Sequence, residues 1–340
     1  MTSIEWVKNA DGSQGLTWNP IRGCTRVSPG CGGPGPHGGC YAEGIAARFS
    51  GPGQPYEGLA VMKGGKPRWT GKLAFIESAL LLPLRHKKPT TWFVNSMSDL
   101  FHESVPDASI DRVFAVMALC PQHTFQVLTK RSMRMRAYLA DLSPASPRVL
   151  AIRTATAPFM SMVLDSARPY RFPLANVWLG VSAEDQRRAD ERVPDLLATP
   201  AAVRFVSAEP LLGPIEFAES WLCYGYLSTP DKPLDWIIVG GESGPNARPM
   251  HPAWARSIRD QCAAAGVAFH FKQWGAWLPA DGWYESHPVS LVIRTWGPAG
   301  WTDDPSDAPE SAQWVARVGK KAAGRLLDGV EHNGMPEVRI

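Results

Sequence analysis

The chain has 340 residues, 44% of them hydrophobic and 20% charged, and this balance excludes an intrinsically disordered polymer. No apolar stretch reaches the 18 or more residues that cross a bilayer, and the first residues do not resemble a signal peptide. We therefore expect a cytoplasmic protein without a membrane partner. The formal net charge is +3, but residues 1–136 carry 16 Lys or Arg against 9 Asp or Glu, which predicts that this part attracts anions.

Three of the six cysteines, Cys24, Cys31 and Cys40, lie in one loop, with the spacing C-x6-C-x8-C. Glycine and proline fill the loop, as suits a backbone that wraps closely around a bound object. Three thiolates can hold a 4Fe-4S cluster and leave one iron open, because a cluster held by protein alone takes four. Alternatively, His37 supplies a fourth ligand and the site is a structural Cys3His zinc centre. We expect Arg22 and Arg26 to lower the pKa of the thiols.

Residues 63–88 are strongly basic. They hold seven Lys or Arg against one acidic residue, with Trp69 and Phe75 between them. Basic residues interleaved with aromatic ones are typical of nucleic-acid binding, and a solvated charged face is the alternative.

Short apolar runs rich in β-branched and aromatic residues predict strands. One lies just before Cys24, and the others are Thr91–Asn95, Thr124–Leu128, Val177–Val181, Val203–Val206, Trp236–Val239 and Ala268–Phe271. Helices are predicted at Asp107–Leu119, Ser132–Leu142, Ala183–Ala198 and Pro252–Ala265, with Ser104 and Ser182 as caps of the first and third. This alternation predicts an α/β fold with a partial or complete TIM-like (β/α) barrel, and a doubly wound open sheet is the alternative.

The domain organisation follows from this pattern. We expect one barrel over residues 1–275, with the cysteine loop at 22–43 and an irregular insertion near 143–175. Residues 276–340 are expected to form a C-terminal extension that packs on the barrel.

Polar residues follow every predicted strand, and the carboxyl ends of parallel strands form the active face of a barrel. Asp99, His102 and Glu209 are candidate catalytic residues, since carboxylates and imidazoles transfer protons. Helix capping is the alternative for Asp99 and His102. Glu184, Glu209 and Glu242 are expected to converge on one pocket. Candidate cofactor-binding residues are Asn95, Ser96, Ser182, Glu209, Gly240, Gly241, Glu242 and Lys272.

Two further groups are candidates for substrate binding. Lys130 and Arg131 lie at a predicted helix start, where backbone amides favour a phosphate. Gln273 and Trp274 follow the last predicted strand and could contact a nucleobase, with a buried tryptophan as the alternative.

The sequence also resembles a known family in a string of short motifs. They are Thr17-Trp18-Asn19-Pro20, Gly23-Cys24-Thr25, Val27-Ser28-Pro29-Gly30-Cys31, Cys40-Tyr41-Ala42-Glu43, Phe93-Val94-Asn95-Ser96-Met97-Ser98-Asp99-Leu100-Phe101-His102, Leu128-Thr129-Lys130-Arg131, Ser207-Ala208-Glu209-Pro210-Leu211-Leu212-Gly213, Val239-Gly240-Gly241-Glu242-Ser243-Gly244 and Phe271-Lys272-Gln273-Trp274-Gly275. They resemble a phage and prophage family of unknown function that has a three-cysteine motif. That family is usually grouped with the radical S-adenosylmethionine barrels, near spore photoproduct lyase.

The resemblance implies a 4Fe-4S cluster held by Cys24, Cys31 and Cys40, with S-adenosylmethionine on the open iron and its reductive cleavage to a 5'-deoxyadenosyl radical. Gly240-Gly241-Glu242 looks like the motif that holds the methionine amine in such enzymes. The chain departs from the family's usual C-x6-C-x2-C spacing by inserting residues before Cys40.

These observations predict an iron–sulfur enzyme of the radical S-adenosylmethionine type in the cytoplasm, that of a bacterial host if phage-encoded. Its expected substrate is a nucleotide or a nucleic acid, with phage DNA modification as one such reaction. One alternative is a non-catalytic nucleic-acid-binding protein with a structural iron–sulfur or zinc site. Another is a hydrolase or transferase that uses the carboxylates.

Overall fold

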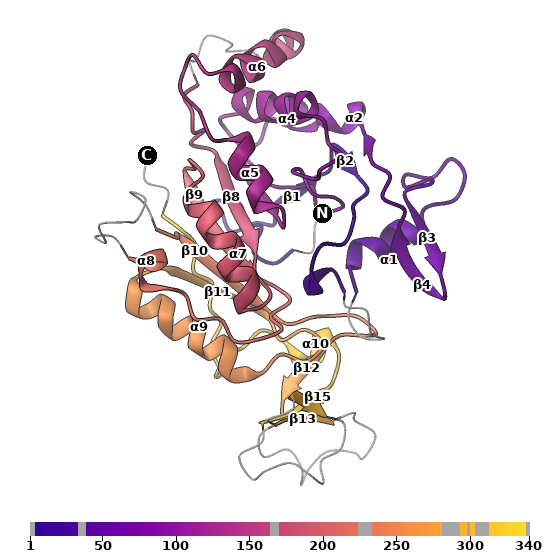
Figure 1. Cartoon of the computed structure of the whole chain (residues 1–340), viewed down its shortest axis with the longest axis vertical. Coiled ribbons are helices and arrows are strands. Elements are labelled where there is room, and N and C mark those ends of the chain that lie inside the picture. Colours follow the sequence, from indigo (N-terminus) through magenta and orange to yellow (C-terminus); the bar gives the residue numbers. More distant parts are fainter. Residues whose placement is uncertain are drawn as a thin grey trace.

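The computed structural model describes residues 4–32, 39–163, 170–223, 233–280, 293–297, 300–302 and 313–337 (Figure 1). Its centre is a seven-stranded parallel sheet in the order β1-β6-β7-β8-β9-β10-β11. The strands are β1 (Leu16–Trp18), β6 (Thr91–Val94), β7 (Thr124–Thr129), β8 (Val177–Ser182), β9 (Val203–Ala208), β10 (Trp236–Gly240) and β11 (Ala268–Gln273). The six strands that were predicted with residue bounds are all confirmed, within two residues at each end.

The strand order decides between the two predicted architectures. From β6 to β11 each strand pairs with the next one along the chain, so the sheet has none of the order reversal that defines a doubly wound fold. Within the described residues β1 and β11 are its two edges, and the sheet curls as a partial barrel. The fold is therefore α/β with a partly closed barrel-like sheet.

Helices cover the outer face of the sheet (Figure 1). The main ones are α4 (Asp107–Leu119), α5 (Ser132–Tyr138), α7 (Gln186–Leu197) and α9 (Pro252–Ala265), and the predicted bounds of α4 and α9 are confirmed. The predicted caps are wrong. Pro106 precedes α4 without a side-chain cap, and Asp185 caps α7 by accepting from the Arg188 amide. Ser182 is thereby left facing the barrel interior.

Smaller elements connect and flank the barrel. Near the cysteine loop lie β2 (Ile21–Arg22), a 3-10 turn (Pro29–Cys31), α1 (Tyr41–Arg48), β3 (Ala60–Lys63), β4 (Lys66–Trp69) and β5 (Ala74–Phe75). Elsewhere lie α2 (Glu77–Leu80), α3 (Leu82–Arg85), α6 (Pro147–Thr156), a 3-10 helix (Ala157–Met162), α8 (Glu219–Leu222) and α10 (Lys320–Ala323). The segment predicted as an irregular insertion thus contains α6. Its mixed composition hides a helix capped by Ser146, which accepts from the Val149 amide.

The C-terminal part forms a second, antiparallel sheet in the order β12-β15-β13-β14. Its strands are β12 (Trp277–Pro279), β13 (Ile293–Gly297), β14 (Gly300–Thr302) and β15 (Gln313–Arg317). The chain then returns to the barrel, where the Phe271 amide donates to the His332 carbonyl and the Gly334 amide to the Phe269 carbonyl. These bonds cover the open edge of β11.

Side chains alternate between the two faces of each strand, and this alternation decides what reaches the barrel interior. The inner residues at the lower levels are large and aromatic, including Phe93, Trp178, Phe205 and Trp236, and Trp6 packs among them. Two residues further along, the same columns end in polar side chains: Asn95 after Phe93, Lys130 after Leu128, Ser182 after Gly180, Ser207 and Glu209 after Phe205, and Lys272 after His270. Inside the barrel, a layer of aromatic side chains, the aromatic floor, therefore lies below a ring of polar side chains at the carboxyl ends of the strands.

In the part of the chain that the structure describes, no helix combines the length and apolarity that a membrane crossing requires.

Candidate functional site

A cavity of about 410 Å³ lies at the carboxyl ends of the parallel strands. All three clustered cysteines line it. It is also lined by most of the predicted site residues: Asn95, Ser96, Asp99, Lys130, Arg131, Ser182, Glu209, Gly241, Glu242, Lys272 and Gln273. Polar side chains from several strand ends thus meet the cysteine loop in one cavity, because all seven strands are parallel and their carboxyl ends lie on the same side of the sheet.

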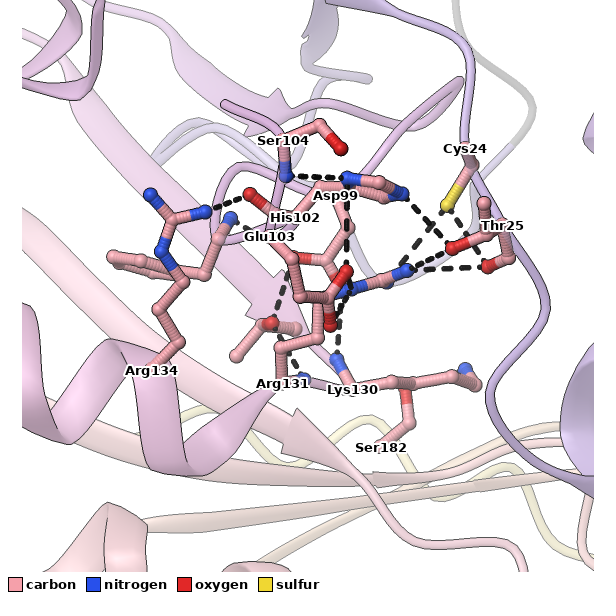
Figure 2. A network of polar contacts seen from close by, with 12 residues as sticks. Cys24, Thr25, Asp99, His102, Glu103, Ser104, Lys130, Arg131, Arg134 and Ser182 are labelled. Atoms are coloured by element: carbon pink, nitrogen blue, oxygen red, sulfur yellow. Dashed lines mark hydrogen bonds and ion pairs between the residues drawn. The ribbon is translucent and has the colours of Figure 1, made fainter. Parts of the chain in front are cut away.

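Asp99 and Arg131 form a buried ion pair beneath Cys24 (Figure 2). Asp99 accepts hydrogen bonds from the Thr129 hydroxyl at 2.7 Å and from the Lys130 amide at 3.0 Å. Arg131 donates to Asp99 at 3.1 Å, to both Glu103 oxygens at 3.0 Å, and to the carbonyl and hydroxyl oxygens of Thr25 at 3.2 and 2.8 Å. It also lies 3.8 Å from the Cys24 sulfur.

These contacts give both residues a role different from the predicted one. Every N–H group of Arg131 has an acceptor, so none is left for the phosphate that was expected at this strand end. Asp99 is engaged at both oxygens and is a positioning residue, not a free proton acceptor. Together they fix the loop that carries Cys24.

His102 contacts Thr25 of the same loop and does not line the cavity. The Ser104 amide donates to its Nδ1 at 3.1 Å, so Nε2 carries the proton and donates to the Thr25 hydroxyl oxygen at 2.9 Å. Burial and the Arg131 charge lower the pKa of His102, which keeps the ring neutral. In this geometry His102 holds Thr25 of the cysteine loop, and its catalytic role stays a prediction.

Glu184 and Glu242 anchor the loop at two further points. Glu184 is fully buried, accepts from the Gly30 amide at 3.0 Å and pairs with Arg192 at 3.0 Å. Glu242 pairs with Arg248 at 2.8 Å and accepts from the Gly39 amide at 3.3 Å. Arg248 in turn donates to the Pro29 carbonyl at 2.9 Å. Although burial raises it, the charges of Lys130 and Arg192 lower the pKa of Glu184 and keep it ionised.

A fourth ion pair completes the support. Arg26 donates from Nε to Glu43 at 3.0 Å and from Nη1 to the Gly32 carbonyl at 3.0 Å. Arg22 instead donates to the Pro55 carbonyl at 2.9 Å and lies over the Tyr56 ring, so the cation that contacts Cys24 is Arg131. Four carboxylate–guanidinium pairs therefore hold the backbone of the cysteine loop. Of the three carboxylates expected to converge on one pocket, Glu209 and Glu242 line the cavity, whereas Glu184 does not and instead contacts the cysteine loop.

Glu209 lies on another wall of the cavity and pairs with Lys272 at 2.7 Å. Gln273 donates from Nε2 to the same carboxylate at 3.3 Å. Lys272 also lies 3.8 Å from Glu5, which Lys320 contacts at 2.7 Å, so segments from both ends of the chain meet here.

Lys130 is the lining cation that forms no salt bridge among the residues that the structure places, although its charge acts on Glu184. Five basic side chains line the cavity, and the other four, Arg26, Arg131, Lys272 and Lys320, are in ion pairs. The Lys130 ammonium group instead donates to the Ser182 hydroxyl at 2.9 Å. It is the best-placed charge for an anionic group of a ligand.

Besides His102, two more predicted site residues lie outside the cavity lining. Trp274 is buried, packs against Phe271 and donates from its indole to the Leu326 carbonyl at 2.8 Å, which agrees with the alternative of a buried tryptophan. Gly240 does not line the cavity, and a Cβ on it would lie 3.2 Å from the Glu209 carboxylate carbon. A Cβ on Gly241 would lie 2.0 Å from the Trp274 carbonyl oxygen, so packing within the chain explains that glycine.

The residues that support the site were not predicted from the sequence. Thr25, Arg192 and Arg248 hold the loop, and Tyr41 and Ser207 line the cavity. One signal was available. Glu184 and Glu242 are each followed by an arginine six or eight residues later, as buried carboxylates need a charged partner.

The three thiols are free and share the cavity, and soft thiolates are the ligands of iron–sulfur clusters and zinc. Burial and the Asp99 charge raise the pKa of Cys24 to about 12, and burial also raises the pKa of Cys40. Without a metal these two thiols are protonated at neutral pH. Within the described ranges no three His, Cys, Asp or Glu side chains form a converged ligand set, and residues 33–38, with His37, lie outside those ranges. The donor set fits a metal centre by its chemistry and its shared cavity.

Comparison with protein families gives one finding. The family described as "Protein of unknown function (DUF5131)" matches residues 1–336. No curated protein and no solved structure matches the chain.

Proposed function

The chain belongs to the DUF5131 family, whose function is unknown, and from its own site we propose an iron–sulfur enzyme of the radical S-adenosylmethionine type. Its substrate is a nucleotide or a nucleic acid, and its place is the cytoplasm, where thiols stay reduced. The observation that carries the proposal is that Cys24, Cys31 and Cys40 line one cavity at the carboxyl ends of seven parallel strands.

The support of the cysteine loop favours a bound group at this place. Four buried or half-buried ion pairs hold the backbone on both sides of the loop. A buried ion pair is weak evidence of stability, because desolvation offsets its attraction. Four of them around one short loop fit a loop whose position matters for binding.

Each cysteine would supply one thiolate to a 4Fe-4S cluster, which leaves an iron open for S-adenosylmethionine. When bound, such a cluster supplies one electron for reductive cleavage of that cofactor. The protein's own residues bind and orient. Asn95 and Ser182 offer polar groups, and Lys130 offers a positive charge to a carboxylate or phosphate. The aromatic floor below excludes water.

Anaerobic reconstitution tests the proposal. The protein is loaded with iron and sulfide, reduced, and incubated with S-adenosylmethionine, and 5'-deoxyadenosine is measured. We expect a brown protein that forms this product. Cys40→Ala should lose the cluster absorbance, whereas Cys223→Ala, which removes a half-buried cysteine away from the cavity lining, should keep it.

Two outcomes would contradict the proposal in different ways. A colourless protein with one tightly bound zinc ion would show a structural metal site. A brown protein that binds nucleic acid but never cleaves the cofactor would be a binding protein with a structural cluster.

A further inference from the structure

One surface beside the cavity combines exposed apolar side chains with unpaired cations. It consists of α1 and the hairpin of β3 and β4, which pack together through Ala42, Ala46 and Ala60 (Figure 1). We call it the α1–hairpin surface. Five of the twelve exposed large apolar side chains of the described residues lie on it: Tyr41, Ile45, Phe49, Val61 and Met62.

The apolar residues follow the periodicity of the helix. Tyr41, Ile45 and Phe49 are spaced by four, which places them on one face of α1 and the residue that follows it. Their exposed fractions are 59%, 42% and 43%. A row of this kind normally faces a core, so its exposure marks an interaction site.

The cations of this surface are available. Arg48 and Lys63 are exposed, Lys66 is half-buried, and their side chains form no ion pair or hydrogen bond with the rest of the described chain. Lys63 and Lys66 flank the tip of the hairpin, where Gly64 and Gly65 both have positive φ. The surface therefore has the positive charge that complements a polyanion.

The α1–hairpin surface is joined directly to the cavity. Tyr41 and Trp69 line the cavity and belong to α1 and β4. Glu43 of α1 accepts from the Trp69 amide at 3.2 Å and pairs with Arg26 of the cysteine loop. A long ligand that lies on this surface would pass the mouth of the cavity.

We propose that the α1–hairpin surface binds single-stranded nucleic acid and positions one of its bases to enter the cavity. Exposed aromatic faces accept stacked bases of any sequence, and adjacent Lys and Arg contact the phosphates. This rests on the proposed function and narrows its substrate to a polynucleotide whose unpaired base enters the cavity. A free nucleotide would need no such surface.

Fluorescence anisotropy with a labelled oligothymidine of about 20 nucleotides tests this inference. We expect binding that weakens steeply between about 50 and 200 mM salt, because phosphate contacts release counterions. Lys63→Ala/Lys66→Ala should weaken binding roughly tenfold and reduce the salt slope by about 1.4, from two lost phosphate contacts. Phe49→Ala should weaken binding at least about fivefold through lost stacking.

Matched variants control for charge and for exposed apolar area. Lys87→Ala/Lys88→Ala removes two exposed lysines that precede β6, at the opposite end of the sheet from the cavity. Leu150→Ala removes an exposed apolar side chain from α6. Both should bind like the wild type, and circular dichroism should show that all variants fold.

Three results would overturn the inference. The first is no oligonucleotide binding at low salt, and the second is that the control variants weaken binding as much as the surface variants do. The third is that the protein binds vesicles that contain phosphatidylserine but does not bind the oligonucleotide. Binding is measured without S-adenosylmethionine. Hence a protein that forms 5'-deoxyadenosine but ignores the oligonucleotide refutes this inference alone. A protein that binds the oligonucleotide but never cleaves the cofactor refutes the proposed chemistry alone.

Discussion

Arg131 illustrates how one residue can carry most of the local order of a site. It contacts Asp99, Glu103, Thr25 and Cys24 and is almost completely buried. Burial alone would lower its pKa, but the charge of Asp99 and the hydrogen bond to Glu103 raise it, so the guanidinium stays charged. Its function is to hold two strand ends and the cysteine loop together.

Arg131→Met should therefore destabilise the protein and reduce its iron content. Removing one partner of a buried pair leaves an uncompensated charge on Asp99, which costs roughly 3 kcal/mol. Arg112→Met removes an exposed pair with Glu77 and should cost about 1 kcal/mol or less. Urea unfolding and iron analysis after reconstitution measure both effects.

The double variant Asp99→Asn/Arg131→Met separates stability from positioning. It restores part of the stability, because no charge is left unpaired, yet it should still load iron poorly. If Arg131→Met unfolds at the same urea concentration as Arg112→Met, the described role of Arg131 is wrong.

The sequence predicted correctly which residues reach the cavity, but it predicted their roles there less well. Asn95, Lys130, Ser182, Glu209 and Lys272 all line it, because strand parity is readable from the chain. The partners of Asp99, Glu184 and Glu242 were not predicted. Arg131 lies 32 residues from Asp99, and the loop glycines that donate to Glu184 and Glu242 lie 154 and 203 residues away from them. Only the arginine partners of Glu184 and Glu242 are near them in the sequence.

Residues on one face of strand β11 have different surroundings at different depths of the barrel. Ala268, His270 and Lys272 alternate with Phe269 and Phe271, which pack toward the helices. Lys272 reaches the cavity, whereas His270 lies deeper, against the Trp236 ring. Neither ring nitrogen of His270 has a hydrogen-bond partner among the described residues.

His270 should make the protein less stable in mild acid. Burial, aided by the charges of Arg325 and Lys272, lowers its pKa to about 4. Between its unfolded pKa of about 6.5 and this value, the unfolded chain binds a proton that the folded chain does not. The free energy of unfolding therefore falls as the pH falls from about 6.5 to 4, by up to about 3 kcal/mol from this group.

Urea titrations at several pH values in this window measure the effect. His270→Phe keeps an aromatic ring against Trp236 and removes the titrating group, so its stability should fall less steeply than that of the wild type. Parallel curves for the two proteins would show that His270 is protonated in the folded state.

Elements with clear periodicity were predicted and irregular ones were not. The helices α4 and α9 have the predicted bounds. By contrast α6, the β3–β4 hairpin and the small C-terminal sheet were not predicted. Their strands and turns are short, and α6 has apolar and polar residues mixed around its axis, so no amphipathic period marks it.

The whole molecule depends on how the last described segment closes the barrel edge. Residues 332 and 334 hydrogen-bond to β11 and cover backbone groups that an edge strand would otherwise expose. A Cβ on Gly334 would lie 2.5 Å from the Phe269 carbonyl oxygen, so the segment fits this edge only with glycine at that position.

Gly334→Ala should displace this segment, lower the melting temperature by several degrees and promote aggregation through the exposed edge, a cost of roughly 2 kcal/mol. Thermal unfolding with light scattering measures both changes. Gly44→Ala is the matched control. Nothing lies within 4 Å of its added Cβ, and alanine favours the helix. An unchanged Gly334→Ala protein would show that the edge is not covered in solution.

The sequence left open the choice between a barrel and a doubly wound sheet. Both arise from alternating strands and helices, and only the order in which strands pair distinguishes them. Pairing order is set by contacts over the whole chain, which local propensity does not encode.

The contact between Glu5 and Lys320 has a consequence for biosynthesis. The cavity wall includes Ile4 and Trp6 from early in the chain and Lys320 from late in it. On the ribosome, the cysteine loop is made more than 250 residues before Lys320, so the nascent chain presents three reduced thiols without a finished pocket. Installation of any metal centre in its complete cavity must therefore follow translation.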